Sequence, residues 1–200
     1  MSHTPLTPQQ HIAYLEGRRR LFLQVVGGWP PNVQGDMLQE ARNAIQKDLA
    51  YVVAFLRDFP GNLAGEEVYA DLLRMAHNAD VPEAGAEAQR LLLDILGRHP
   101  ESYSANLSIA CLYVCSSQAH SPDAERYFRK ALELKPELPD PAIYQGLGFS
   151  LLYQGKTEEA TAQFEQYLKH VPGDTRIAGL LNKLASGEQP RPVYVESPHP

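Results

Sequence analysis

The sequence is poor in the residues that build disulfide frameworks and nucleic-acid interfaces. Its 200 residues include two cysteines and one tryptophan, and its 18 Lys and Arg are outnumbered by 24 Asp and Glu. The resulting formal charge of −6 disfavours nucleic acid as a partner, because phosphates attract a surface rich in Lys and Arg. The sequence also has no apolar run near the roughly 20 residues that a membrane-spanning helix needs. We therefore expect no membrane span and no nucleic-acid partner.

The two cysteines, Cys111 and Cys115, stand four residues apart at core positions of one predicted helix. A pair on the same helix does not make a disulfide framework. Free cysteine behaves as a small hydrophobic residue, so we predict two buried free thiols. A metal or redox role is the alternative interpretation.

Motifs that carry chemistry are missing as well. There is no P-loop and no G-x-S-x-G elbow. Glu158 and Glu159 open a predicted helix, where acidic side chains favour the helix dipole, and His99 and His170 fall in last turns, where a cation is favoured. We predict no catalytic residue, no cofactor-binding residue, no metal site and no cofactor. The expected protein is not an enzyme.

What the sequence does have is a pattern of small and apolar residues that recurs every 36 positions. Hydrophobic residues make up 44% of the chain, which is enough for a sizeable core without metals or disulfides. Each period reads as a helical hairpin, and hairpins that cannot bury their apolar faces alone stack on their neighbours. The recurring positions are Ala88, Ala124 and Ala160; Leu92, Phe128 and Phe164; Leu96, Leu132 and Leu168; and Pro100, Pro136 and Pro172.

The clearest copy of the pattern lies between residues 141 and 174. There Tyr144, Leu147, Gly148 and Leu151 have the spacing of W-x2-L-G-x2-Y, the first half of a tetratricopeptide unit. The chain therefore resembles the tetratricopeptide repeat family. This resemblance implies an all-α fold, a right-handed superhelix of helical hairpins or α-solenoid, that binds protein partners.

We divide the chain into an N-terminal part, a repeat array and a tail. Residues 1–65 form an arm and a helical hairpin, which caps the array or is itself a degenerate repeat. Three repeats and a capping helix follow, and residues 187–200 form a proline-rich extended tail. The expected repeats are about 66–101, 102–138 and 139–173, and the capping helix is 174–186.

Helix boundaries follow from capping residues and prolines. Thr7, Asp36 and Asp174 are predicted helix caps, with Pro8 in the first turn after Thr7. The expected helices run from residue 8 to 26, from 36 to 59, and then as the pairs 66–79 with 83–98, 102–116 with 122–135, and 141–154 with 157–170, before the capping helix.

Residues 19–23, RRLFL, resemble a twin-arginine export signal. The apolar run that should follow is broken by Gly27, Gly28, Pro30 and Pro31, and no small-residue cleavage site comes after it. Cytoplasmic retention is the expected location, and export is the alternative.

The connector from residue 27 to 35, GGWPPNVQG, carries the only tryptophan. Large aromatic side chains are highly buried on average, so Trp29 is predicted to cover the first helix pair. An exposed anchor for a partner is the alternative.

The resemblance also implies which residues face a concave groove, because the first helix of each hairpin lines it. The partner-binding residues expected on this basis are Leu73, His77, Asn106, Ile109, Tyr113, Gln145, Phe149 and Tyr153, with Ala70, Asp80, Ser117 and Ala142 beside them, and Arg176 and Lys183 from the terminal helix.

The centre of this groove is aromatic, so we expect a protein or peptide segment, extended or helical, with an apolar anchor near Tyr113, Phe149 and Tyr153. Some family members clamp a terminal carboxylate with lysine and asparagines. Only Asn106 suits that role here, which disfavours chaperone tails as ligands. The alternative is that Tyr113 and Phe149 merely complete the core between hairpins.

The leading functional hypothesis is a cytoplasmic adaptor or assembly factor that holds one partner protein. A narrower version is similar to the small acidic three-repeat chaperones of bacterial secretion systems, which keep hydrophobic export substrates soluble. The third hypothesis is a self-assembling structural protein, a homo-oligomer formed through the N-terminal hairpin or through the tail with Tyr194 as its anchor.

Overall fold

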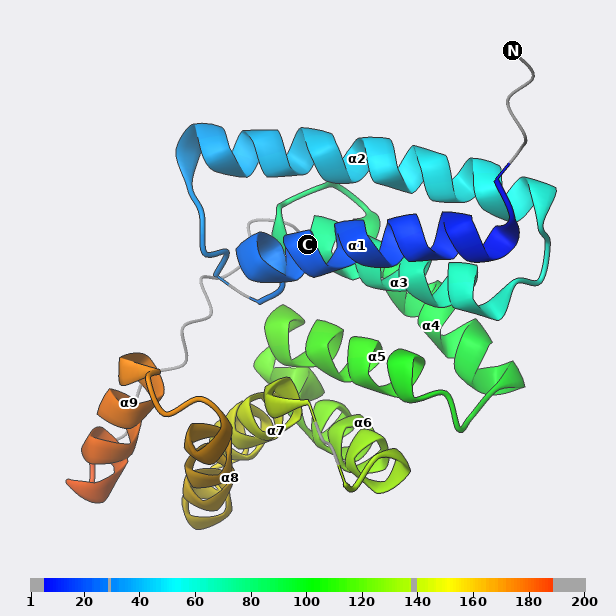
Figure 1. Ribbon diagram of the computed structural model, residues 1–200. Helices are drawn as coiled ribbons and strands as arrows, with labels where there is room; N and C mark the ends of the chain where they lie inside the picture. The colour runs from blue at the N-terminus through cyan, green and yellow to red at the C-terminus, as the bar shows by residue number, and fades with distance from the viewer. Residues whose placement is uncertain (1–5, 29, 138–139, 189–200) are drawn as a thin grey trace. The chain divides into compact units, whose positions relative to one another are not determined.

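The computed structural model describes residues 6–28, 30–137 and 140–188, and the regular structure within these ranges is all helical (Figure 1). The prediction of an all-α fold is confirmed. Trp29, Tyr194 and the rest of residues 189–200 lie outside the described ranges. The helices are α1 (Pro8–Val26), α2 (Gly35–Asp58), α3 (Leu63–Asn78), α4 (Ala84–Arg98), α5 (Tyr103–Ser116), the short 3-10 helix η1 (Gln118–His120), α6 (Ser121–Leu134), α7 (Pro141–Tyr153), α8 (Thr157–His170) and α9 (Thr175–Ala185).

Two of the predicted caps form as expected. The Thr7 hydroxyl accepts a hydrogen bond from the Gln10 backbone N–H at 3.3 Å, and the Gln10 side chain accepts one from the Thr7 N–H at 2.8 Å. This reciprocal pair is a capping box and fixes the start of α1. Asp174 caps α9 in the same sense, because its carboxylate accepts from the backbone N–H groups of Arg176 and Ile177.

Two helix starts differ from prediction. The helix α2 begins at Gly35, so Asp36 lies in its first turn, where its charge favours the helix dipole, and is not the cap. The helix α3 begins at Leu63, three residues early, because the Asn62 side chain accepts a hydrogen bond from the Gly65 N–H at 2.9 Å. Asn62 is therefore the N-terminal cap that the hydrophobic pattern did not reveal.

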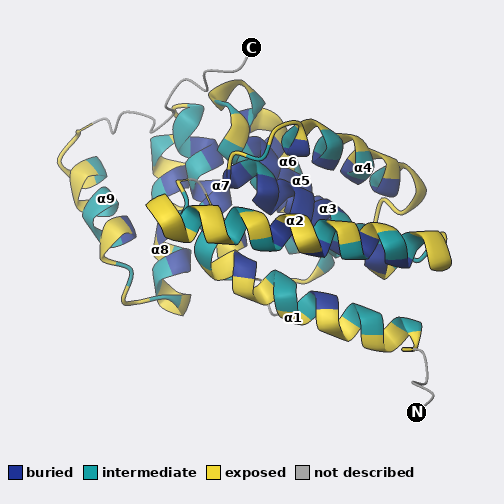
Figure 2. Ribbon diagram, turned by 90° about the horizontal axis from the view of Figure 1, so that it is seen from above, coloured by how far each residue is buried: buried dark blue, intermediate teal, exposed yellow. Residues whose placement is uncertain are grey.

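The chain divides into two compact units, residues 1–108 and 109–200, and the boundary falls within α5. In the first unit α3 is the most deeply buried helix, with Leu72, Met75 and Ala76 fully inaccessible. In α1 and α2, by contrast, buried positions alternate with exposed ones along the helix (Figure 2). Both helices are therefore amphipathic elements that leave one face in solvent.

A buried ion network joins α1 to α3 inside the first unit. The carboxylate of Asp71, 3% exposed, accepts from Arg74 at 2.7 Å, from Arg19 at 3.1 Å and from the Ser108 hydroxyl at 2.9 Å. Burial opposes ionisation, but the two guanidinium groups outweigh it and lower the pKa of Asp71 to about 2. Arg19, from the stretch that resembles an export signal, is thus partly buried and paired with a buried carboxylate of the folded unit.

The carbonyls at the end of α1 are also bound by α3. Arg74 donates to the Gly27 carbonyl at 2.7 Å, and the Asn78 amide donates to the Val26 carbonyl at 3.0 Å. The last carbonyls of a helix have no partner within the helix. Arg74 and Asn78 donate to two of these carbonyls, so side chains of α3 stabilise the C-terminal end of α1.

The second unit is built on close contacts between phenylalanine rings and glycines. The ring of Phe128 from α6 lies on Gly146 of α7, and the ring of Phe164 from α8 lies on Gly148. A Cβ at either glycine would collide with the ring. Gly148 is the glycine of the W-x2-L-G-x2-Y pattern, and its role here is to let an aromatic ring reach the α7 backbone.

The cysteines are free, as predicted, but Cys111 and Cys115 are only half-buried, so the expectation of buried thiols is wrong. The helix α5 is apolar around most of its circumference, and periodicity alone does not rank how deeply each of its positions is covered. None of the described helices combines the length and apolarity needed to cross a membrane.

Candidate partner-binding surface

The groove residues expected on α3 are mostly interior. Ala70 and Leu73 are buried, His77 is half-buried and Asp80 is exposed. The His77 ring packs on Gly85 at the start of α4, where a Cβ would lie 2.7 Å from Nδ1. Burial lowers the pKa of His77, the Asp80 carboxylate acts against this, and Arg74 adds to it. In this unit Leu73 and His77 pack between helices and present little surface to a partner.

The loop from α3 to α4 has a strained backbone and is held in place by a side chain of α2. Asp80 and Glu83 have φ values of 57° and 62°, the left-handed region that non-glycine residues seldom adopt. Arg42 of α2 donates to the Ala79 carbonyl at 2.5 Å and pairs with Asp80 at 3.5 Å. The loop conformation is therefore stabilised by α2.

Asn106 and Ile109, the groove residues expected on α5, are also buried, at 2% and 0% exposure. The Asn106 amide donates to the carbonyls of Pro100 at 3.0 Å and Ser102 at 2.7 Å. Both of its N–H groups are used in closing the turn before α5. Asn106 is thus committed to local structure and does not present the free amide that a carboxylate clamp requires.

Tyr113 lies in the interior of the second unit. It is 7% exposed, its ring stacks on His120 with centroids 5.0 Å apart, and Tyr127 lies at 6.0 Å. The 3-10 helix η1 ends at His120 and thereby brings that imidazole onto the tyrosine ring. For Tyr113 these contacts favour the core interpretation over the anchor interpretation.

Gln145, Phe149 and Tyr153 lie on one face of α7 and are all half-exposed; we call them the α7 stripe. They are four residues apart, which is about one helical turn, so the three side chains form a row along the helix. Phe149 stacks with Tyr153 at 6.0 Å between centroids and meets Phe164 edge-on at 5.1 Å. The buried residues of α7 are Ile143, Gly146, Leu147, Gly148, Ser150 and Leu151.

The two cationic residues expected on α9 are exposed. Arg176 pairs with Asp174 at 3.2 Å, and Lys183 lies 3.8 Å from Glu188. Both ion pairs are close in sequence and lie at the surface, where such pairs contribute little to stability. Their side chains are thus accessible for contact with a partner.

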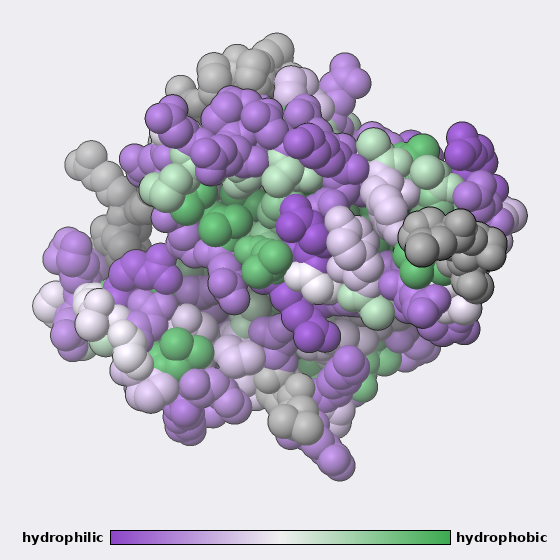
Figure 3. All heavy atoms as spheres, turned by 45° about the horizontal axis from the view of Figure 1, so that its top comes forward, coloured by the Kyte–Doolittle hydropathy of each residue, from purple (hydrophilic) through white to green (hydrophobic). Residues whose placement is uncertain are grey.

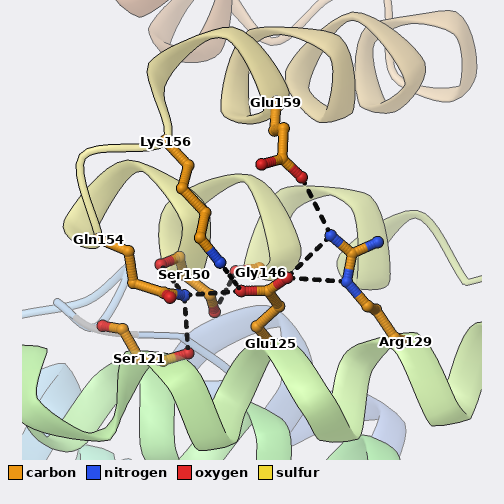
Figure 4. Close-up of polar contacts among 8 residues, drawn as sticks. All are labelled: Ser121, Glu125, Arg129, Gly146, Ser150, Gln154, Lys156 and Glu159. Atoms are coloured by element: carbon orange, nitrogen blue, oxygen red, sulfur yellow. Dashed lines mark hydrogen bonds and ion pairs between the residues drawn. The ribbon is translucent and has the colours of Figure 1, made fainter.

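A polar cluster that the sequence pattern did not indicate fixes the end of the α7 stripe (Figure 4). Glu125 of α6 accepts from Lys156 at 2.7 Å, from Gln154 at 2.9 Å and from Arg129 at 2.8 Å. Burial raises the pKa of Glu125, but these donors prevail and lower it to about 2. The carboxylate therefore anchors the turn that directly follows Tyr153.

A residue of η1 also contacts the Tyr153 backbone: the Gln118 side chain donates to its carbonyl at 2.8 Å. The aromatic end of the α7 stripe is consequently attached to both η1 and α6. Sequence reasoning found the stripe through the family resemblance, but it did not find Gln118 or Glu125, because neither has a fixed place in the repeat pattern.

Among the described residues, most of the exposed large hydrophobic side chains lie on or beside α1 and α2: Leu6, Tyr14, Leu21, Leu23, Met37 and Val53. On the face drawn in Figure 3, hydrophobic residues form clusters among hydrophilic ones. Within the described ranges, no three His, Cys, Asp or Glu side chains are grouped so that they could hold a metal ion.

Comparison with known proteins identifies the repeats. Residues 121–184 match the family model for the tetratricopeptide repeat, and no curated protein matches the chain. The matched region runs from the start of α6 through α7 and α8 and into α9, so it contains the Phe128–Gly146 and Phe164–Gly148 contacts. Residues 121–184 are therefore similar to tetratricopeptide repeats.

Proposed function

We propose that this protein is a non-enzymatic adaptor that binds a segment of one partner protein on the α7 stripe. The family supports the general class, because tetratricopeptide repeats mediate protein–protein interaction. The observation that carries the specific proposal is the pair Phe149 and Tyr153, two stacked aromatic rings that remain partly exposed on α7. Aromatic residues of this kind dominate the energetics of protein interfaces.

The geometry also supports a rigid binding surface. Phe149 is braced edge-on by Phe164, and the Tyr153 carbonyl is held by Gln118. Side chains that are ordered before binding lose less conformational entropy when a partner arrives. The segment that fits such a surface has an apolar side chain for the ring pair and a hydrogen-bonding group for the Gln145 amide one turn earlier.

A surface substitution tests this proposal. Tyr153→Arg replaces a partly exposed ring by a cation at the aromatic end of the α7 stripe. Ala162→Arg on α8 makes the same change from neutral to positive at an exposed position outside the stripe and is the matched control. Both variants and the native chain are used for affinity purification from the source cell, and circular dichroism checks their helix content.

The expected result is a protein retained by the native chain and by Ala162→Arg and lost with Tyr153→Arg. Direct titration with the purified partner should then show binding weakened at least about tenfold, since truncating an aromatic anchor costs more than 1 kcal/mol. Equal retention by all three chains would show that the α7 stripe is not the working surface.

We place this activity in the cytoplasm. Arg19 is the first arginine of the stretch that resembles an export signal, and its pairing with buried Asp71 supports retention. To serve as a signal, α1 would have to leave the interior of the first unit. Fractionation of cells that express the full chain tests this, and a shortened form outside the cytoplasm would contradict it.

A further inference from the structure

The side of α2 next to α1 carries five residues at intervals of three or four, which we call the α2 face: Met37, Glu40, Ala44, Lys47 and Tyr51. Tyr51, at one end, is partly exposed and also packs against His11 and Tyr14 of α1. Three of them, with Tyr14 and Arg18 of α1, line an open groove of about 550 Å³. Met37 is 62% exposed and Tyr14 is 47% exposed. This groove belongs to the first unit and is separate from the α7 stripe.

The floor of the groove is electrostatically satisfied. Asp48 is 4% exposed, and its carboxylate accepts from Arg18 at 2.7 Å and from the Tyr14 hydroxyl at 3.4 Å. No isolated buried charge therefore demands a ligand ion. The other charged residues of the groove, Glu40 and Lys47, lie at its rim and are exposed. They form no ion pair within the part of the chain that the structure describes.

The α2 face is complementary in charge to its own reversed order. Ala44 is at its centre, with Glu40 before it and Lys47 after it. A large side chain lies at each end, Met37 at one and Tyr51 at the other. An antiparallel copy of the helix centred on Ala44 would bring Glu40 opposite Lys47 of the second copy, and Lys47 opposite Glu40. It would also set Met37 against the second Tyr51, a contact of sulfur with an aromatic ring that is favourable.

We infer that the α2 face is a two-fold symmetric contact through which two copies of this chain associate. A two-fold interface uses the same patch on both subunits, so the patch has to be complementary to itself. The opposite charges of Glu40 and Lys47 meet that requirement. The small side chain of Ala44 permits close approach of the helices at the axis.

The dimer is of moderate strength. The α2 face spans four turns, roughly 20 Å along the helix, which corresponds to an interface at the small end of the range for specific complexes. Both ion pairs are at the rim of the interface. Such pairs contribute more to the specificity of association than to its affinity, and salt weakens them. The association is therefore in the micromolar range and stronger at low ionic strength.

Charge exchange in the full-length chain tests this. Sedimentation equilibrium at low salt compares the native chain with Glu40→Lys, Lys47→Glu, the double exchange, and an equimolar mixture of the two single variants. Each single variant places like charges at both contacts, so its dimer dissociation constant should rise about tenfold or more. The double exchange and the mixture restore opposite charges at both contacts and should dimerise like the native chain.

Several results would overturn the inference. They are a native chain that stays monomeric at hundreds of micromolar, single variants that dimerise normally, or a mixture that fails to recover. Both positions are exposed, so the variants should keep native helix content by circular dichroism. Tyr153→Arg serves as a further control, because it should dimerise like the native chain even if it loses its partner protein.

Discussion

The ring of Phe164 lies on Gly148 so closely that a Cβ at that glycine would come within 2.5 Å of the ring. Gly148→Ala should therefore destabilise the protein, because either the ring or α7 must move. Overpacking of a dense core typically costs about 1–3 kcal/mol. Chemical denaturation followed by far-ultraviolet circular dichroism measures the change.

Two controls separate this collision from the ordinary effect of alanine in a helix. Gly179→Ala in α9 meets no atom within 4 Å and should leave stability unchanged or raise it, since alanine favours helix. Phe164→Leu combined with Gly148→Ala should cost less than the sum of the two single changes. Additive costs would contradict the proposed contact.

Asp71→Asn should be among the most destabilising single changes in the first unit. It leaves Arg74, 2% exposed, without its ionic partner, and removing one member of a buried ion pair costs about 3–5 kcal/mol. Asp94→Asn is the matched control, because the Asp94 side chain is 60% exposed in its pair with Arg98. The control should change the free energy of unfolding by less than about 0.5 kcal/mol.

The same residue gives a pH dependence of known sign. The pKa of Asp71 is lowered to about 2 in the folded chain, whereas an unfolded aspartate has a pKa near 3.9. Its stabilising contribution is thus complete above about pH 4–5 and is lost as the pH falls towards 2. Unfolding measured from pH 7 to pH 2 should show a shallower decline for Asp71→Asn than for the native chain.

Glu125→Gln should loosen the turn after α7 and leave the rest of the second unit folded. The amide has one acceptor oxygen where the carboxylate has two, and its NH2 group cannot accept from Lys156 or Arg129, so we expect a loss of about 1 kcal/mol at neutral pH. Amide exchange should accelerate at residues 153–157. An unchanged exchange rate there would show that the cluster does not hold the turn; Glu165→Gln, exposed on α8, is the control.

Glu83→Gly should stabilise the protein by about 0.5–1 kcal/mol. Glu83 has a φ of 62°, which glycine adopts without the steric penalty that other residues incur, although glycine also gains freedom in the unfolded chain. Glu83→Ala retains the Cβ and should not stabilise. A melting temperature that rises equally in both variants would mean that the Glu83 side chain, and not its backbone, carries the strain.

The helices were predictable because their limits depend on local chemistry. The side chains of Thr7 and Asp174 accept from backbone N–H groups two or three residues later, and the 36-residue period shows which faces are apolar. The Asp71 network could not be found in this way. Arg19 and Asp71 are 52 residues apart, and periodicity assigns a position to a face without showing which charged groups meet there.

The candidate surface was predictable only in part. The family resemblance identifies the residues on the inner side of each first helix but not how deeply each is covered. Tyr113 is covered because η1 brings His120 onto its ring, and Asn106 is occupied by the turn that precedes its own helix. Phe149 and Tyr153 stay partly exposed. Depth of burial depended on loops, which the repeat pattern does not describe.

The contacts between α1 and α3 have a consequence for anyone who wishes to express part of this protein. A fragment trimmed to its recognisable repeats would start near residue 60 and discard Arg19, Val26 and Gly27. Arg74 and Asn78 would then lose their carbonyl acceptors, and Asp71 would lose one of its two cations. The helix α1 is thus an internal part of the first unit, and we expect a fragment that keeps these contacts to begin at Thr7 or earlier.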